Sequence, residues 1–114
     1  MKNITKATIN SILNNGGATF NYNGERVQMK SGYQVSKQDL VIVPIADFNK
    51  YLIKALVEML GGRGEYLGVW VDSGKVYADI SCRVATKRDA MQMGRDLNQL
   101  SILRWADMEC LAVV

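Results

Sequence analysis

The sequence predicts a single α+β domain over residues 1–114, built as a mostly antiparallel sheet with about three helices packed mainly on one face. Three observations lead to this prediction. The chain has 114 residues, a length that suits one hydrophobic core. Apolar residues recur at helical spacing in three separate segments. Between these segments, short runs of β-branched residues are joined by tight polar turns, which favour hairpins over parallel crossovers.

The three helical segments are predicted at about 3–14, 46–60 and 86–98. The second is the most regular, and we expect it to form the centre of the core. Its apolar stripe comprises Phe48, Tyr51, Leu52, Ile53, Ala55, Leu56, Val57, Met59 and Leu60. The third opens at Thr86 with the form of a capping box. Gly94 on its inward face indicates a close backbone contact with the sheet.

The strands are predicted where apolar and polar residues alternate or where β-branched residues cluster. They fall in a first hairpin at 18–21 and 26–29, a run at 40–43, a second hairpin at 66–71 and 75–80, and a final run at 101–105 that turns into 109–113. Residues 31–36 are expected to be irregular or briefly extended. The two hairpins support an antiparallel sheet.

The hairpin around Asp72-Ser73-Gly74 has the clearest alternation in the chain. Its expected core-facing residues are Leu67, Val69, Val71, Val76, Ala78 and Ile80. Its expected opposite face carries Tyr66, Trp70, Tyr77 and Asp79. A monomer rarely leaves such an aromatic patch bare. Three interpretations are open: the N-terminal helix covers the patch, a partner binds to it, or nucleic-acid bases stack on it.

The composition excludes several classes of active site. The sequence contains no histidine, so catalysis or metal binding that depends on an imidazole is ruled out. Cys82 and Cys110 match no metal motif or disulfide framework, and we expect two reduced thiols in the interior. No metal and no cofactor are predicted. Asp79 and Cys82 are the remaining catalytic candidates, and either would need a pocket around it. We expect the protein not to be an enzyme.

We expect the protein to be cytoplasmic, because its two cysteines are read as reduced thiols and its hydropathy indicates a soluble chain. The formal net charge is +3, which is low for a dedicated nucleic-acid binder. No apolar stretch follows the N-terminal lysines, and no segment approaches the roughly 20 apolar residues that span a membrane. We therefore expect a soluble protein that does not contact a membrane.

One segment concentrates basic residues. It carries Arg83, Lys87, Arg88 and Arg95, interrupted by Asp89 and Asp96. These cations form either an ordinary solvated helix face or a site for phosphate groups, to which the helix start near Thr86 would add its own preference for anions.

Two stretches of the chain carry a further pattern. The first is Gly16-Gly17-Ala18-Thr19 with Ser31-Gly32-Tyr33-Gln34-Val35, and the second is 64–72 with 76–81, Gly94-Arg95 and 98–102. This order resembles small uncharacterised proteins encoded by phages, plasmids and integrative elements. In those proteins a Gly-Tyr-x-Val stretch precedes a Leu-Gly-x-Trp…Tyr-x-Asp hairpin and a Gly-Arg helix. The relatives continue as Ala-Ile-Tyr/Phe-Asp, where this chain has Ser101-Ile102-Leu103-Arg104.

The resemblance implies a setting on a mobile genetic element. Small phage proteins without catalytic residues often act stoichiometrically by occluding a host protein, as anti-CRISPR and other anti-defence inhibitors do. We therefore expect non-enzymatic binding to a host protein that inhibits a bacterial defence complex such as a CRISPR effector. The expected binding residues are Tyr66, Trp70, Tyr77, Arg83, Lys87, Arg88 and Arg95.

Two further expectations concern partners. A nucleic-acid-associated protein that places the segment 83–95 on phosphates is the alternative function, and it is the less favoured one. A homodimer through the apolar C-terminus at 111–114 and an uncovered sheet face is compatible with either function.

Overall fold

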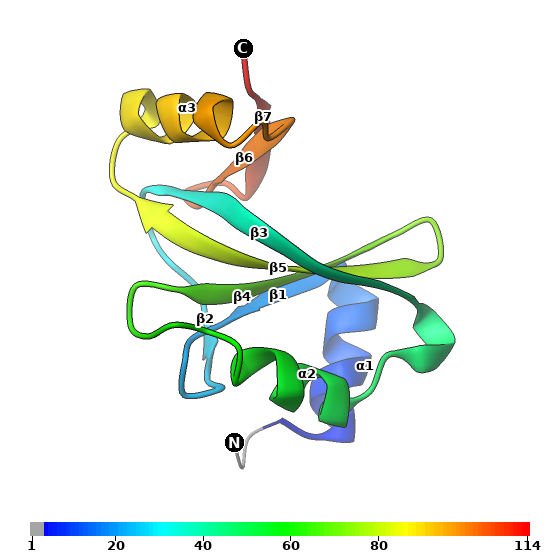
Figure 1. Ribbon diagram of the computed structural model, residues 1–114. Coiled ribbons are helices and arrows are strands. Elements are labelled where there is room, and N and C mark those ends of the chain that lie inside the picture. Colours follow the sequence, from blue (N-terminus) through cyan, green and yellow to red (C-terminus); the bar gives the residue numbers. More distant parts are fainter. Residues whose placement is uncertain (1–3) are drawn as a thin grey trace.

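A single antiparallel sheet forms the centre of the molecule, and helices lie against it (Figure 1). The computed structural model describes residues 4–114. Within them, seven strands pair in the order β2-β1-β4-β5-β3-β6-β7. The strands are β1 (Gly17–Phe20), β2 (Arg26–Val27), β3 (Tyr33–Pro44), β4 (Tyr66–Asp72), β5 (Lys75–Val84), β6 (Ser101–Arg104) and β7 (Glu109–Ala112). The helices are α1 (Lys6–Asn15), α2 (Lys50–Val57), α3 (Lys87–Asp96) and the short 3-10 helix η1 (Ile45–Asp47). The predicted α+β class is confirmed.

The larger part of the core lies between the sheet and helices α1 and α2. Helix α1 begins after Thr5, whose Oγ1 accepts a hydrogen bond from the Thr8 N–H at 3.4 Å. It ends at Gly16, whose φ of 89° suits a glycine. Its expected start at Asn3 lies outside the described residues. The fully buried side chains of this cluster include Ile12, Phe20, Ile53, Leu67 and Val76.

Helix α3 packs near the other end of the sheet on a smaller cluster. That cluster is built on Val35, Ala90 and Ile102. Gly94 faces it so closely that a Cβ atom built there would lie 2.9 Å from Val113 Cγ2. The close contact predicted from this glycine is confirmed.

All three α-helices lie on the same face of the sheet. Val76 and Ala78 of β5 pack in the cluster of α1 and α2, and Val84 of the same strand packs beside α3. These three residues occupy alternate positions of one strand, so their side chains point to the same side. The prediction that the helices pack mainly on one face is therefore confirmed.

Strand β3 differs from the sequence prediction. An irregular or briefly extended segment at 31–36 and a separate strand at 40–43 were expected, whereas Tyr33–Pro44 forms one strand. Its pairing with β5 shifts register between Ser36 and Gln38, and again between Asp39 and Val41. Each shift is an irregularity that breaks the alternation of apolar and polar residues, so the pattern of a long strand is hidden.

The second helix is shorter than predicted. Residues Ile45–Asp47 form a 3-10 turn, and α2 begins only after Asn49, whose Oδ1 accepts a hydrogen bond from the Leu52 N–H at 3.0 Å. Tyr51 and Met59, which were assigned to the apolar stripe, are 69% and 56% exposed. The predicted stripe is too wide because Met59 follows the last helical residue and Tyr51 lies on the solvent side.

Candidate functional site

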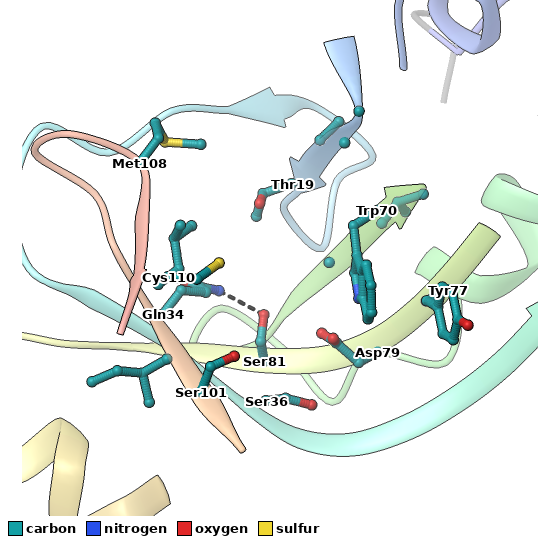
Figure 2. A pocket seen from close by; sticks show the side chains of 18 of the residues that line it. Thr19, Gln34, Ser36, Trp70, Tyr77, Asp79, Ser81, Ser101, Met108 and Cys110 are labelled. Carbon is teal, nitrogen blue, oxygen red and sulfur yellow. Dashed lines mark hydrogen bonds between the residues drawn. The ribbon is translucent and has the colours of Figure 1, made fainter. Parts of the chain in front are cut away.

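The face of the sheet opposite the helices is hollowed into a cleft of about 1050 Å³ (Figure 2). Residues from all seven described strands line it, with β3, β4 and β5 in the middle and the two edges of the sheet on either side. The strong twist of the sheet brings those edges around the hollow. Helix α1 packs on the other face through Ile9 and Ile12. The interpretation in which the N-terminal helix covers the aromatic patch is therefore wrong.

Two aromatic rings stand together at one end of the cleft. Trp70 of β4 lies directly opposite Tyr77 of β5 in the ladder. Their ring centroids are 4.2 Å apart with an interplanar angle of 12°, which is a stacked arrangement. Trp70 is nevertheless 45% exposed. The stack thus holds a large aromatic side chain at the solvent boundary.

Glycines border this tryptophan on two sides. Gly17 of β1 is its partner across the ladder, and Gly68 precedes it by two positions on the same face of β4. A Cβ at Gly17 would lie 2.7 Å from the Val69 carbonyl oxygen, so only glycine fits there without a shift. The floor of the cleft beside Trp70 is consequently bare backbone.

The carboxyl group of Asp79 projects into the same hollow (Figure 2). Burial, and to a smaller extent the charge of Asp39, raise the pKa of Asp79 from its ordinary value to about 7. Asp39 of β3 stands directly opposite it in the ladder. An acid with this pKa changes its charge near neutral pH.

Ser36 lies close to this carboxyl group. Its hydroxyl acts to lower the pKa of Asp79, against the effect of burial. The Ser36 Oγ is buried and makes no hydrogen bond of regular geometry with any described residue. The cleft therefore contains a polar atom that a ligand could satisfy.

A buried hydrogen-bond chain supports the other end of the cleft. The Trp105 Nε1–H donates to Gln34 Oε1 at 3.1 Å, and Gln34 Nε2 donates to Ser81 Oγ at 2.6 Å. The Ser81 hydroxyl lies 3.4 Å from the Tyr66 carbonyl oxygen, to which it donates. This chain joins the turn residue that follows β6 to β3, β5 and β4, so it fixes the curvature of the sheet beneath the cleft.

The two cysteines lie in different environments. Cys82 contacts Met93 of α3, with 3.5 Å between the sulfur atoms, and burial raises the pKa of its thiol. This residue belongs to the packing beneath α3, and it does not line the cleft. Cys110 is exposed and lines the cleft, so the expectation of two interior thiols is wrong for Cys110. Of the two catalytic candidates, Asp79 lines the cleft and Cys82 does not.

The predicted basic residues lie outside the cleft. Arg83 donates through Nε to the Ser31 carbonyl oxygen at 3.0 Å. Arg95 donates to the Val114 carbonyl oxygen at 2.8 Å. Lys87 and Arg88 are exposed at the start of α3, where Arg88 lies 3.7 Å from Asp89. Two of the four cations are therefore committed to contacts within the chain.

The residues predicted to bind a partner do not form one continuous site in the structure. Trp70 and Tyr77 share the cleft with Asp79, whereas Tyr66 falls on the same face by alternation but is not among the cleft residues. Sequence reasoning missed further groups of the cleft, among them Thr19, Gly68 and Gln34. Gly68 gave a usable signal, because a glycine inside a strand often marks a close approach.

Comparison of the chain with family models, curated proteins and solved structures gave no match in any of the three. Across residues 4–114, no helix is both long and apolar enough to cross a membrane. The same residues contain no group of three or more side chains placed to hold a metal ion.

Proposed function

We propose that this protein is a non-enzymatic binding module that holds a segment of a partner protein in the cleft on the helix-free face of its sheet. The observation that carries the proposal is the exposed Trp70–Tyr77 stack at the wall of a hollow of about 1050 Å³. Tryptophan and tyrosine dominate the binding energy of protein interfaces, and a concave site buries more of a ligand than a flat one.

The charge of the cleft favours a protein over a nucleic acid. Phosphate groups in the cleft would lie near Asp79 and Asp39, which repel them when ionised. A nucleic-acid site on the segment 83–95 would depend on Lys87 and Arg88, because Arg83 and Arg95 bond within the chain. The family resemblance favours a host protein as the partner, in particular a component of a bacterial defence complex such as a CRISPR effector.

Site-specific photocrosslinking in an extract of the bacterial host tests this proposal. A photoreactive amino acid replaces Met108, which is 52% exposed and lines the cleft. The matched control carries the same group at Tyr51, which is 69% exposed on α2. We expect one defined protein to crosslink from position 108 and not from position 51. Equal crosslinking from both positions, or crosslinking from 51 alone, would place the interface elsewhere.

A catalytic role for Asp79 is a second candidate. The observation that favours it is a carboxyl group with a pKa of about 7 inside a cleft, which is a property of general acids and bases. Catalysis would change the partner covalently, whereas binding leaves its covalent structure unchanged. If the partner recovered from the crosslinking experiment keeps its mass after prolonged incubation with an excess of the wild-type protein, Asp79 is not acting as a catalyst on it.

A further inference from the structure

We infer that the cleft recognises the guanidinium group of an arginine side chain on the partner protein, held between the Trp70 indole and the Asp79 carboxylate. This inference rests on the proposed function, because it names the chemical group of the partner that enters the cleft. Three features of the cleft lead to it: the shape of its floor, its charge, and the buried Ser36 hydroxyl beside Asp79, which makes no regular hydrogen bond with any described residue.

The space beside Trp70 has the shape of a flat slot. Tyr77 covers one face of the indole, and Figure 2 shows the other face turned toward the hollow, on the side where Asp79 lies. Gly17 and Gly68 contribute only backbone to the floor there. A Cβ at Gly68 would lie 2.6 Å from Asp79 Oδ1, so the absence of a side chain is what allows the carboxyl group its position. A planar group can therefore reach both the ring and the carboxylate.

The charge of the slot is complementary to a cation. Asp79 and Asp39 face each other across the ladder, and directly opposed side chains of antiparallel strands lie about 4.5–5.5 Å apart at Cβ. Two like charges at this separation repel, and a bound cation relieves that repulsion. Arg26 is the one basic residue among the described residues that line the cleft. Its guanidinium donates to Ser11 Oγ at 2.9 Å and to the Gly17 carbonyl oxygen at 3.4 Å, and within the described residues it forms no ion pair with Asp39 or Asp79.

Arginine suits this slot better than lysine does. Its guanidinium is planar, so it stacks on an indole while its forked N–H groups pair with both oxygens of a carboxylate. A lysine ammonium is a point charge and gains less from a flat wall. The buried Ser36 Oγ, which has no regular hydrogen bond within the described chain, can accept a remaining guanidinium N–H.

Protonation of Asp79 competes with this cation. The titratable group that faces Asp79 from β3 is Asp39. On β5 itself, Tyr77 is the neighbour of Asp79 on the same face. From β4 the facing residue is Gly68, which carries no charge. A guanidinium pairs with the ionised acid, so binding strengthens as the pH rises through about 7 and Asp79 loses its proton.

The test is a nuclear magnetic resonance titration of the isotope-labelled full chain with capped Gly-Gly-Arg-Gly-Gly. The matched probes replace arginine by lysine or by citrulline, the neutral isostere of arginine. A single side chain in such a slot is expected to bind with a dissociation constant on the order of millimolar. The arginine peptide should shift the Trp70 indole and Gly68 amide signals, and its affinity should exceed that of the citrulline peptide by about tenfold. The lysine peptide should fall between them.

Two variants and the pH dependence complete the test. Asp79→Asn and Trp70→Leu should each weaken arginine binding by about tenfold, whereas Asp72→Asn, a matched acid at the exposed hairpin end, should leave it unchanged. Equal binding of the arginine and citrulline peptides to the wild-type chain would overturn the inference without any variant. If a partner then still crosslinks from position 108 alone, the proposed function stands while the arginine assignment fails.

Discussion

Gly68 and Asp79 face each other across the β4–β5 ladder, and the carboxylate occupies the place that a side chain at position 68 would take. A Cβ built on Gly68 would lie 2.6 Å from Asp79 Oδ1. The conformation of Gly68 itself does not require a glycine, since its φ is not positive. The glycine is therefore needed for space, and the acid at the base of the cleft depends on it.

Gly68→Ala should displace this carboxyl group. Contacts below about 3 Å force a movement, and overpacking of this kind costs about 1–3 kcal/mol of unfolding free energy. Chemical denaturation measures the cost. Gly64→Ala is the matched control, because a Cβ at Gly64 would meet no atom within 4 Å. Equal stability of the two variants would show that Asp79 moves without cost.

The pH dependence of stability should carry the signature of Asp79. Its folded pKa is raised from 3.8 to about 7, so the folded state keeps a proton that the unfolded state loses. The contribution of Asp79 to the free energy of unfolding is fully present below about pH 4. It declines by about 1.4 kcal/mol per pH unit as the pH rises toward 7. Unfolding free energies of wild type and Asp79→Asn should diverge over that window and run parallel above it. Profiles that stay parallel throughout would mean that folding does not raise the pKa of Asp79.

Ser81→Ala should destabilise the protein by about 1–3 kcal/mol, because it leaves the buried Gln34 Nε2 without the acceptor that it has at 2.6 Å. Ser101→Ala, at an exposed position of the cleft, is the control and should change stability by less than about 0.5 kcal/mol. Thermal unfolding compares the two. A silent Ser81→Ala would indicate that Gln34 finds another acceptor.

Gly94→Ala should lower stability by about 1–2 kcal/mol, even though alanine favours a helix by roughly 1 kcal/mol relative to glycine. The added methyl group would lie 2.9 Å from Val113 Cγ2. Adding Val113→Ala makes room, so the double variant should be more stable than the sum of the two single effects predicts. Strictly additive effects would argue against a direct clash.

The sequence was most informative where one strand keeps a regular alternation. The β4–β5 hairpin alternates without interruption, so its two faces, and with them the common face of Trp70, Tyr77 and Asp79, were predictable. In β3 the two register shifts near Lys37 and Leu40 break that alternation, and the contributions of Gln34 and Ser36 to the cleft were hidden. Local periodicity cannot reveal a face that a bulge moves out of phase.

The cleft as a whole was beyond sequence reasoning for a topological reason. Thr19 and Cys110 belong to strands near opposite edges of the sheet, and they line one hollow only because the sheet coils. That coiling depends on which strands pair, and β3 pairs with both β5 and β6 across long stretches of chain. The basic segment 83–95 was predicted to form a surface. The hydrogen bonds of Arg83 to Ser31 were not predictable, because they depend on the pairing of β3 with β5.

The affinity of the chain for the protein that crosslinks in the cleft tests the central claim most directly. Calorimetry should compare Trp70→Ala with Tyr51→Ala, an exposed aromatic residue on α2 that lies outside the cleft. We expect Trp70→Ala to weaken binding by about thirtyfold or more, as the loss of an aromatic anchor does, and Tyr51→Ala to leave it unchanged. An affinity that survives Trp70→Ala intact would contradict the assignment of the cleft as the binding site.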